Sequence, residues 1–342
     1  MKVVTLGEIM LRLSTPGFQR FVQAQSFDVT YGGGEANVAV ALANYGLESA
    51  FVSKLPTHEI GQAAVDHLRR FGVDTRHVVR GGDRVGIYFL ETGASQRPSK
   101  VIYDRADAAV TTLTVDELDL DAIFDGVRWF HFTGITPALG ATARQTVTAA
   151  AKAAKAAGAT VSCDLNFRKK LWTTAEAQAT MRPLMEFVDV CIANEEDAEK
   201  CLGLTAGETD VHGAELDEAG YVALAKRLKR EFDFEAVAIT LRESYSASRN
   251  GWSALLHDDR DCREPVRSTR YDIQIVDRVG GGDSFASGLI AGLLQKDDSR
   301  DALEFAVAAS CLKQTIPGDF NLVSRAEVEA LAAGDGSGRV QR

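Results

Sequence analysis

The sequence has no long hydrophobic run. Its 342 residues contain no stretch of about 18 consecutive apolar residues, which excludes a conventional membrane-spanning helix. The first residues include Glu8 and Arg12, and such charges are not typical of the apolar region of a secretory signal. We therefore expect a protein of the cytoplasm that has no membrane partner.

Paired cysteines and an excess of positive charge are also absent. The five cysteines are scattered and form no C-x-x-C pair, which argues against a disulfide framework or a zinc site and favours buried thiols. The 38 basic residues are outnumbered by 48 acidic ones, giving a net charge of −10, so we expect no nucleic-acid partner. An anionic ligand must therefore be bound by a local site. The sequence contains no G-x-x-x-x-G-K-[ST] phosphate loop, and no G-x-G-x-x-G motif follows its first expected strand.

Short runs of β-branched residues alternate with alanine-rich helical patterns along most of the chain. This alternation predicts an α/β fold with a doubly wound, mostly parallel sheet flanked by helices. Helices are expected at 35–45 and 141–157, each followed by a glycine where a carboxyl-terminal cap belongs. The expected strands are residues 3–8, 48–55, 127–133, 159–166, 187–193 and 235–241.

Two segments depart from this alternation. Residues 9–31 and 84–105 have the pattern of extended hairpins, and we interpret them together as a small antiparallel sheet that acts as a lid. We predict one domain over residues 1–330 and a flexible tail over 331–342, which is poor in apolar residues. The acidic stretch 207–220 is expected to form a surface loop.

The sharpest local signal is a triple glycine, Gly280, Gly281 and Gly282, followed by Asp283 and a helix of small apolar residues. Glycines allow backbone N–H groups to converge, and a helix start adds partial positive charge, so this pattern predicts an anion pocket. A carboxylate beside such a pocket can accept a proton from an attacking hydroxyl. The alternative is a glycine-rich turn in which Asp283 merely caps the helix.

A second glycine cluster precedes the first expected helix. Gly33 and Gly34 would let a small polar ligand approach the backbone, and the amide of Asn37 can both donate to and accept from a sugar hydroxyl. The alternative is a tight turn packed under the lid.

These two motifs, each opening a helix in an α/β chain, resemble those of the ribokinase (PfkB-type) carbohydrate kinases. The resemblance extends from about residue 3 to 330. Here Gly281 stands where the family usually has alanine, which leaves the N–H groups of the pocket in place. The resemblance implies a ribokinase-like fold, catalysis by Asp283 with the amides of Gly280–Gly282, and sugar binding by Gly33, Gly34 and Asn37.

Within that family the sequence is most similar to the 2-keto-3-deoxygluconate kinases. The segments that carry this similarity are 101–105, 134–139, 164–168 with 171–172, and 318–323. A sugar acid carries a carboxylate, for which guanidinium is the best-matched side chain, and Arg105 and Arg168 are both expected near the strand ends. Tyr88 and Tyr103 would line the lid side of the pocket. The alternatives are two surface arginines in weak ion pairs and two tyrosines in ordinary sheet packing.

Further roles are implied by the resemblance alone. Asp319 would contact a substrate hydroxyl. ATP would be held near Asn166, Asn194, Thr240 and Arg242, together with Gly280 and Gly282, although residues 242–246 read Arg-Glu-Ser-Tyr-Ser where many relatives have a Gly-x-x-Gly turn. Asp197 stands in the place of the glutamate of the family's magnesium motif and would act on Mg²⁺, directly or through water. The alternative is an exposed helix start, because acidic residues are favourable in a first turn.

The function that the resemblance implies is ATP-dependent phosphorylation of 2-dehydro-3-deoxy-D-gluconate at its 6-hydroxyl. A kinase for a neutral sugar such as fructose or ribose is the nearest alternative, and a non-catalytic sugar or nucleotide sensor is a more distant one. Exposed edges of a lid sheet would also favour a homo-oligomer.

Overall fold

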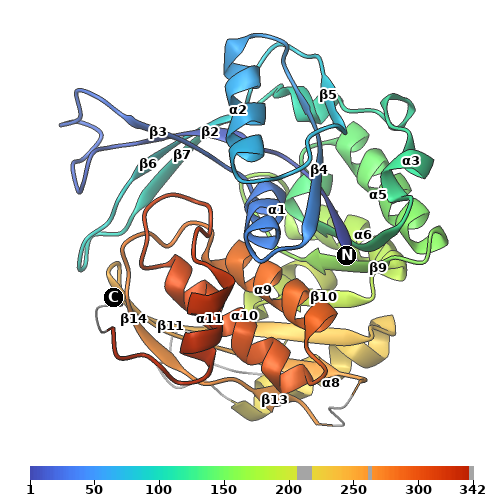
Figure 1. Ribbon diagram of the computed structural model, residues 1–342, viewed down its shortest axis with the longest axis vertical. Helices are drawn as coiled ribbons and strands as arrows, with labels where there is room; N and C mark the ends of the chain where they lie inside the picture. The colour runs from blue at the N-terminus through green and yellow to red at the C-terminus, as the bar shows by residue number, and fades with distance from the viewer. Residues whose placement is uncertain (206–217, 261–263, 339–342) are drawn as a thin grey trace.

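The computed structural model describes residues 1–205, 218–260 and 264–338 (Figure 1). Its main sheet has seven neighbouring parallel strands in the order β5-β4-β1-β8-β9-β10-β11. They are β1 (Lys2–Leu6), β4 (Glu48–Leu55), β5 (Val78–Arg80), β8 (Val127–Thr133), β9 (Thr160–Asp164), β10 (Val190–Ala193) and β11 (Ala236–Ser246). An antiparallel extension follows, made of β12 (Arg249–Asp258), β13 (Val266–Arg267) and β14 (Tyr271–Gln274).

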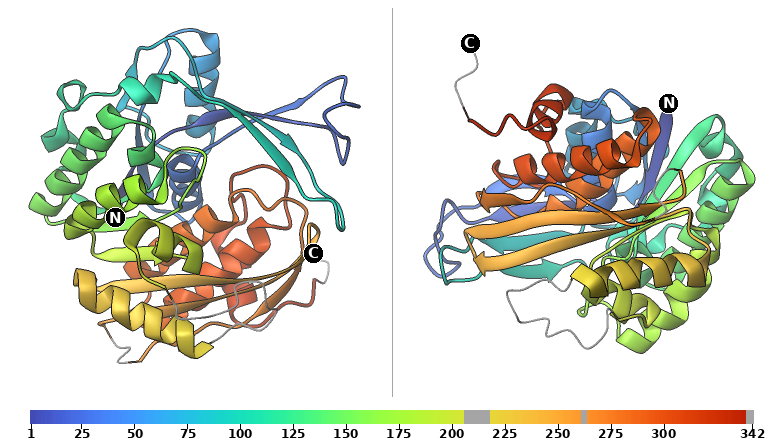
Figure 2. Two further views of the ribbon diagram at one scale, coloured as in Figure 1. Left: turned by 180° about the vertical axis from the view of Figure 1, so that it is seen from behind. Right: turned by 90° about the horizontal axis from the view of Figure 1, so that it is seen from below.

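Helices cover both faces of this sheet, which confirms the expected α/β architecture (Figure 2). One face is covered by α1 (Gly34–Asn44), α9 (Gly281–Gln295), α10 (Ser299–Lys313) and α11 (Arg325–Ala332). The other is covered by α5 (Ala141–Ala156), α6 (Thr174–Leu184) and α8 (Glu218–Phe232). The remaining helices are α2 (Glu59–Arg70), which packs near β4, and the short α3 (Leu120–Phe124), α4 (Ile135–Ala138) and α7 (Glu195–Asp197).

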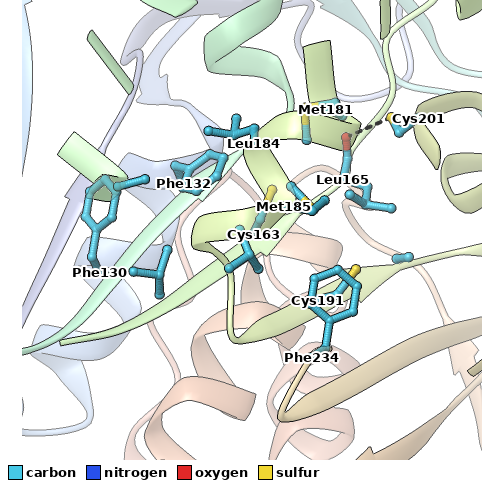
Figure 3. Close-up of a cluster of buried hydrophobic side chains, with 14 of the residues drawn as sticks. Phe130, Phe132, Cys163, Leu165, Met181, Leu184, Met185, Cys191, Cys201 and Phe234 are labelled. Atoms are coloured by element: carbon cyan, nitrogen blue, oxygen red, sulfur yellow. Dashed lines mark hydrogen bonds between the residues drawn. The ribbon is translucent and has the colours of Figure 1, made fainter. Parts of the chain in front are cut away.

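A cluster of buried hydrophobic side chains lies on the α5 and α6 side of the sheet (Figure 3). Phe130 and Phe132 of β8 stack with ring centroids 5.9 Å apart, and both side chains are fully buried. Three of the four described cysteines, Cys163, Cys191 and Cys201, lie in this cluster as free thiols. Burying such apolar surface contributes about 25 cal/mol per Å², so this core provides a rigid support for the strand ends above it.

A second, smaller sheet projects from the body, as the two extended segments predict (Figure 1). It contains β2 (Met10–Ser14), β3 (Asp28–Gly32), β6 (Ile87–Glu91) and β7 (Lys100–Asp104). The outer pairings are antiparallel, but the central strands β2 and β6 are parallel. The sheet is therefore mixed rather than purely antiparallel, because its two hairpins come from separate parts of the chain and no tight turn joins β2 to β6.

Several expected boundaries shift. Strand β11 continues five residues beyond the expected end at 241, because it forms a long hairpin with β12. Helix α11 includes the buried Leu331 and ends at Ala332, so these residues belong to the packed domain rather than to the tail. Most of the acidic stretch 207–220 and the tail residues 339–342 lie outside the described residues. In the described part of the chain, no helix is long and apolar enough to cross a membrane.

Candidate active site

The start of α9 lies at one end of the main sheet and presents unpaired backbone donors. Gly280 caps this helix in the left-handed region, with φ of 81°, and a Cβ at this position would lie 2.1 Å from the carbonyl oxygen of Asp319. The first helical hydrogen bond runs from the N–H of Ser284 to the carbonyl oxygen of Gly280, at 2.9 Å. The N–H groups of Gly282 and Asp283 therefore have no acceptor in the described structure, and Gly282 is exposed. This arrangement is a site for an anion.

Asp283 lies in the first turn of the same helix and is held by a residue from α1. The side-chain amide of Asn37 donates to Oδ2 of Asp283 at 2.6 Å. Burial raises the pKa of Asp283 to about 6, while this hydrogen bond and the positive charge of Arg168 oppose the shift. A carboxylate with this pKa is unprotonated at neutral pH and basic enough to accept a proton.

The second glycine cluster lies directly opposite. A Cβ on Gly33 would come within 1.9 Å of the carbonyl oxygen of Glu8, so only glycine fits there. A Cβ on Gly34 would lie 3.7 Å from Oδ1 of Asp283, which places the two helix starts side by side. Asn37 uses its amide oxygen to accept from the N–H of Gly33 at 3.2 Å. The structure thus brings both predicted motifs together, and Asn37 positions Asp283 in addition to its predicted contact with sugar.

A buried charge network joins the small sheet of β2, β3, β6 and β7, called the lid below, to the glycine loop, residues Gly280–Gly282. Arg12 of β2 forms ion pairs with Asp277 at 2.5 Å and with Asp319 at 2.6 Å. The hydroxyl of Tyr88, from β6, donates to Oδ2 of Asp319 at 2.5 Å. Both oxygens of Asp319 are therefore engaged within the protein, and Tyr88 is only 3% exposed. That Asp319 and Tyr88 contact the substrate remains a prediction. The hydrogen bond between them connects the lid to the segment next to the glycine loop.

Arg105 lies at the base of the lid. It pairs with the buried carboxylate of Glu8, and its guanidinium lies 5.4 Å from the ring centroid of Tyr103. The Nε of Arg105 and Oε1 of Glu8 are buried without a hydrogen-bond partner among the described residues. Tyr103 is 38% exposed and also has the ammonium of Lys170 5.6 Å from its centroid. This end of the site is therefore cationic and keeps unused hydrogen-bonding capacity.

Arg168 follows β9 and is exposed. Its positive charge acts on Asp164, Asp197 and Asp283, but it forms no ion pair with any described residue. Its guanidinium is thus available to a ligand near the base carboxylate. An anion placed between Arg168 and the start of α9 would be stabilised from both sides.

The predicted magnesium and nucleotide residues gather at the ends of β9 and β10. The side-chain oxygen of Asn194 accepts from the N–H of Asp197 at 2.8 Å, and Oδ1 of Asp197 accepts from the N–H of Phe167 at 2.9 Å. Asn166, with φ of 37°, donates its N–H to Asp164 at 3.1 Å. Within residues 1–205, 218–260 and 264–338, no group of three or more His, Cys, Asp or Glu side chains could by itself hold a metal ion.

Thr240 falls inside the strand expected at 235–241, and Arg242, expected just after that strand, falls inside its extension. Both are within β11, where Thr240 pairs with Ala254 and Arg242 with Trp252 of β12. Burial lowers the pKa of Arg278, and the positive charge of the exposed Arg242 lowers it further. Arg278 lies two residues before Gly280 and has a buried Nε with no hydrogen-bond partner among the described residues. Among the described residues neither guanidinium forms an ion pair with a carboxylate, which leaves both available to an anionic ligand such as a polyphosphate.

Sequence reasoning missed several of these contributors. Arg12 and Glu8 stand in unremarkable local sequence, and Arg278 was missed although it lies two residues before Gly280. The contacts of all three residues span more than 30 residues of the chain. Glu35 was also missed, although it directly follows Gly34 of the second glycine cluster. Its buried carboxylate accepts from Thr133 at 2.9 Å and Thr136 at 2.6 Å, which ties the start of α1 to the end of β8.

Helix-start amides, an adjacent carboxylate and surrounding guanidiniums are groups typical of enzymes that transfer a phosphoryl group to a hydroxyl group. The comparisons agree with this class. Residues 1–321 match the model of the pfkB family of carbohydrate kinases, and the chain belongs to that family. The resemblance noted from the glycine motifs is therefore confirmed.

Three relatives show how sequence identity to this chain varies among similar proteins. The crystal structure of a 2-dehydro-3-deoxygluconokinase from Thermotoga maritima is 55% identical, with a TM-score of 0.92 and 98% of each chain covered. A 2-dehydro-3-deoxygalactonokinase from Haloferax volcanii is 37% identical over 98% of both chains. A fructokinase with bound ATP from Xylella fastidiosa is 22% identical, with a TM-score of 0.76 over 97% of this chain and 98% of that one, and shares the fold.

Proposed function

We propose that the protein transfers the terminal phosphoryl group of ATP to the 6-hydroxyl of 2-dehydro-3-deoxy-D-gluconate, giving the 6-phosphate and ADP. The observation that carries this proposal is the placement of Asp283 beside the free amides of α9, with Arg105 and Arg168 on the sugar side. The sequence relatives named for 2-dehydro-3-deoxy sugar acids support the substrate class.

In the proposed reaction, Asp283 accepts the proton of the 6-hydroxyl as its oxygen attacks the terminal phosphorus of ATP. The bond from that phosphorus to the bridging oxygen breaks, and ADP leaves. The N–H groups of Gly282 and Asp283 stabilise the charge on the transferred group, and Asn37 keeps the carboxylate in place. Arg242 and Arg278 would hold the remaining phosphates.

Mg²⁺ is a further part of the proposal. Mg²⁺ usually keeps several waters and binds one or two carboxylates together with substrate phosphates, so the absence of a group of three ligands among the described residues is compatible with it. Asp197 and Asp164, whose negative charges interact at the strand ends, are the residues that would hold it, directly or through water. When bound, the ion would neutralise phosphate charge.

The rate should fall in acid as Asp283 takes up a proton. Only the unprotonated carboxylate can act as the base, and its pKa in the free protein is about 6. We expect kcat/KM to be constant at neutral and alkaline pH and to decrease about tenfold per unit well below the pKa. A pH profile of kcat/KM measures this directly. A profile that stayed flat through pH 5 would rule out Asp283 as the titrating base.

Arg105 should determine the preference for an acid over a neutral sugar. Replacing Arg105 with methionine removes a guanidinium that we propose binds the substrate carboxylate, so kcat/KM for the sugar acid should fall about 100-fold. The low turnover of fructose or ribose should change much less than that of the sugar acid. Arg84→Met is a matched control, because Arg84 lies in the same segment and pairs with the exposed Asp104. Equal losses on acid and neutral sugars would favour the neutral-sugar alternative.

The overall proposal is tested by a coupled assay of ADP release with 2-dehydro-3-deoxygluconate, gluconate, fructose and ribose. We expect fast release with the first of these and little with the others. ADP release that does not depend on any sugar acid would contradict the proposal. No consumption of ATP with any sugar would favour the sensor.

We also propose that the protein works in the cytoplasm as a homo-oligomer that associates through the lid. The lid and its connecting segment expose large apolar side chains, namely Phe18, Val22, Phe27, Val29 and Ile102, which are 39% to 89% exposed. Such a cluster favours contact with a partner surface. Sedimentation of the wild type should give a multiple of 36.9 kDa, and Val22→Glu should shift it toward the monomer. A monomeric wild type would contradict this proposal.

A further inference from the structure

Lys313 is a fully buried lysine directly beneath the glycine loop. It is the last residue of α10, and its side chain has no solvent exposure. Its Nζ donates to the carbonyl oxygen of Asp277 at 3.2 Å. A Cβ on Gly280 would lie 3.3 Å from Cε of Lys313, so the lysine stem packs against the turn that opens α9. A lysine is almost never buried so completely without a compensating role.

The charges around Lys313 indicate what that role is. Beneath the loop, the single positive charge of Arg12 faces two carboxylates, Asp277 and Asp319. Without a further cation this buried cluster would carry a net negative charge next to the amides that receive a phosphate. Lys313 interacts electrostatically with both carboxylates and with Asp283. Burial lowers the pKa of Lys313, and the charges of Asp277 and Asp319 oppose that shift, so the ammonium form is the one that brings the cluster to neutrality.

We propose that Lys313 is a positioning residue for phosphoryl transfer, whose buried ammonium cancels the negative charge beneath the glycine loop and fixes the loop through Asp277. This inference rests on the proposed function, since it assumes that the phosphoryl group lies at the amides of Gly282 and Asp283. Lys313 itself does not touch the reacting atoms. It acts by allowing those amides to attract an anion.

Two neutral substitutions separate this electrostatic role from a packing role. Lys313→Gln keeps an N–H donor, on a side chain one bond shorter than that of lysine, and removes the charge, whereas Lys313→Met removes both. If the charge is what matters, both variants should lower kcat by about 30-fold or more, the scale on which one charge acts in a partly buried site. KM for the sugar should change little. If only the hydrogen bond mattered, the glutamine variant would retain the wild-type kcat, which would overturn the proposal.

A pH profile provides a second readout that a purely structural role would not move. The groups that act electrostatically on Asp283 are Arg168, Lys313, Asp319 and Asp164. Because Lys313 favours the ionised form of Asp283, its loss should move the acid limb of kcat/KM to higher pH. An acid limb unchanged in both neutral variants would contradict the proposal.

Two controls complete the experiment. Phe305→Leu, a buried substitution in the same helix, should lower thermal stability without changing kcat or the acid limb. Asp283→Asn distinguishes a failure of the proposed function from a failure of the inference about Lys313. If Asp283→Asn retains activity, the proposed function itself fails. If Asp283→Asn is inactive while both Lys313 variants have wild-type kcat, only the inference about Lys313 fails.

Discussion

Replacing Asp283 with asparagine is expected to lower kcat by about 10³-fold, within the range for loss of a general base. The amide has nearly the same shape and can still contact Asn37, but it cannot accept the hydroxyl proton. The affinity for ATP should change little, because the N–H groups at the start of α9 remain. Steady-state kinetics with the sugar acid and ATP measure both quantities.

Asp301→Asn is the matched control for this variant. Asp301 occupies the same position in the first turn of α10 that Asp283 occupies in α9, so both substitutions remove a negative charge from a helix start. Asp301 is exposed and distant from the glycine loop in sequence, and its variant should retain the wild-type kcat. Equal activity of the two variants would show that Asp283 only caps its helix.

Gly280→Ala should have the second largest effect. Its φ of 81° is strained for alanine, and the added Cβ would lie 2.1 Å from the carbonyl oxygen of Asp319, which belongs to the backbone and cannot rotate away. The loop must shift, so the amides at the start of α9 lose their alignment. We expect kcat to fall by about 10² to 10³, as for loss of an oxyanion-hole donor, together with a lower melting temperature.

Gly282→Ala tests whether a substitution in this loop can leave thermal stability unchanged. A Cβ on Gly282 would meet no atom within 4 Å, and its backbone is not left-handed. This variant should therefore keep the melting temperature of the wild type, although the methyl group lies where the phosphate is proposed to bind. A large loss of stability in Gly282→Ala, or none in Gly280→Ala, would contradict this description of the loop.

Local patterns in the sequence predicted most of the fold. The strand at 48–55 and the helix at 141–157 lie within one residue of β4 and α5, because a short, mostly buried apolar run defines the strand locally and a glycine after the helix defines its end. The parallel pairing of β2 with β6 was missed, since it depends on how two distant hairpins meet. The extension of β11 was missed for the same reason, because its pairing with β12 determines where it ends.

The residues of the candidate site were likewise predicted only in part. Asp283, Asn37 and the glycines were predicted because each lies in a short motif with its own chemistry. Arg12 and Lys313 were not, because a charged residue inside an otherwise ordinary strand or helix shows its role only when its partners are seen. Asp277 and Asp319, the partners of Arg12, lie 265 and 307 residues away in the sequence.

The central claim is that the phosphoryl group is transferred at the start of α9. A crystal structure with the sugar acid, ADP and a metal fluoride mimic of the transferred group tests it most directly. We predict that the mimic will accept hydrogen bonds from the N–H groups of Gly282 and Asp283, with the 6-hydroxyl beside the Asp283 carboxylate. A mimic bound elsewhere, or a 6-hydroxyl out of reach of that carboxylate, would contradict the account.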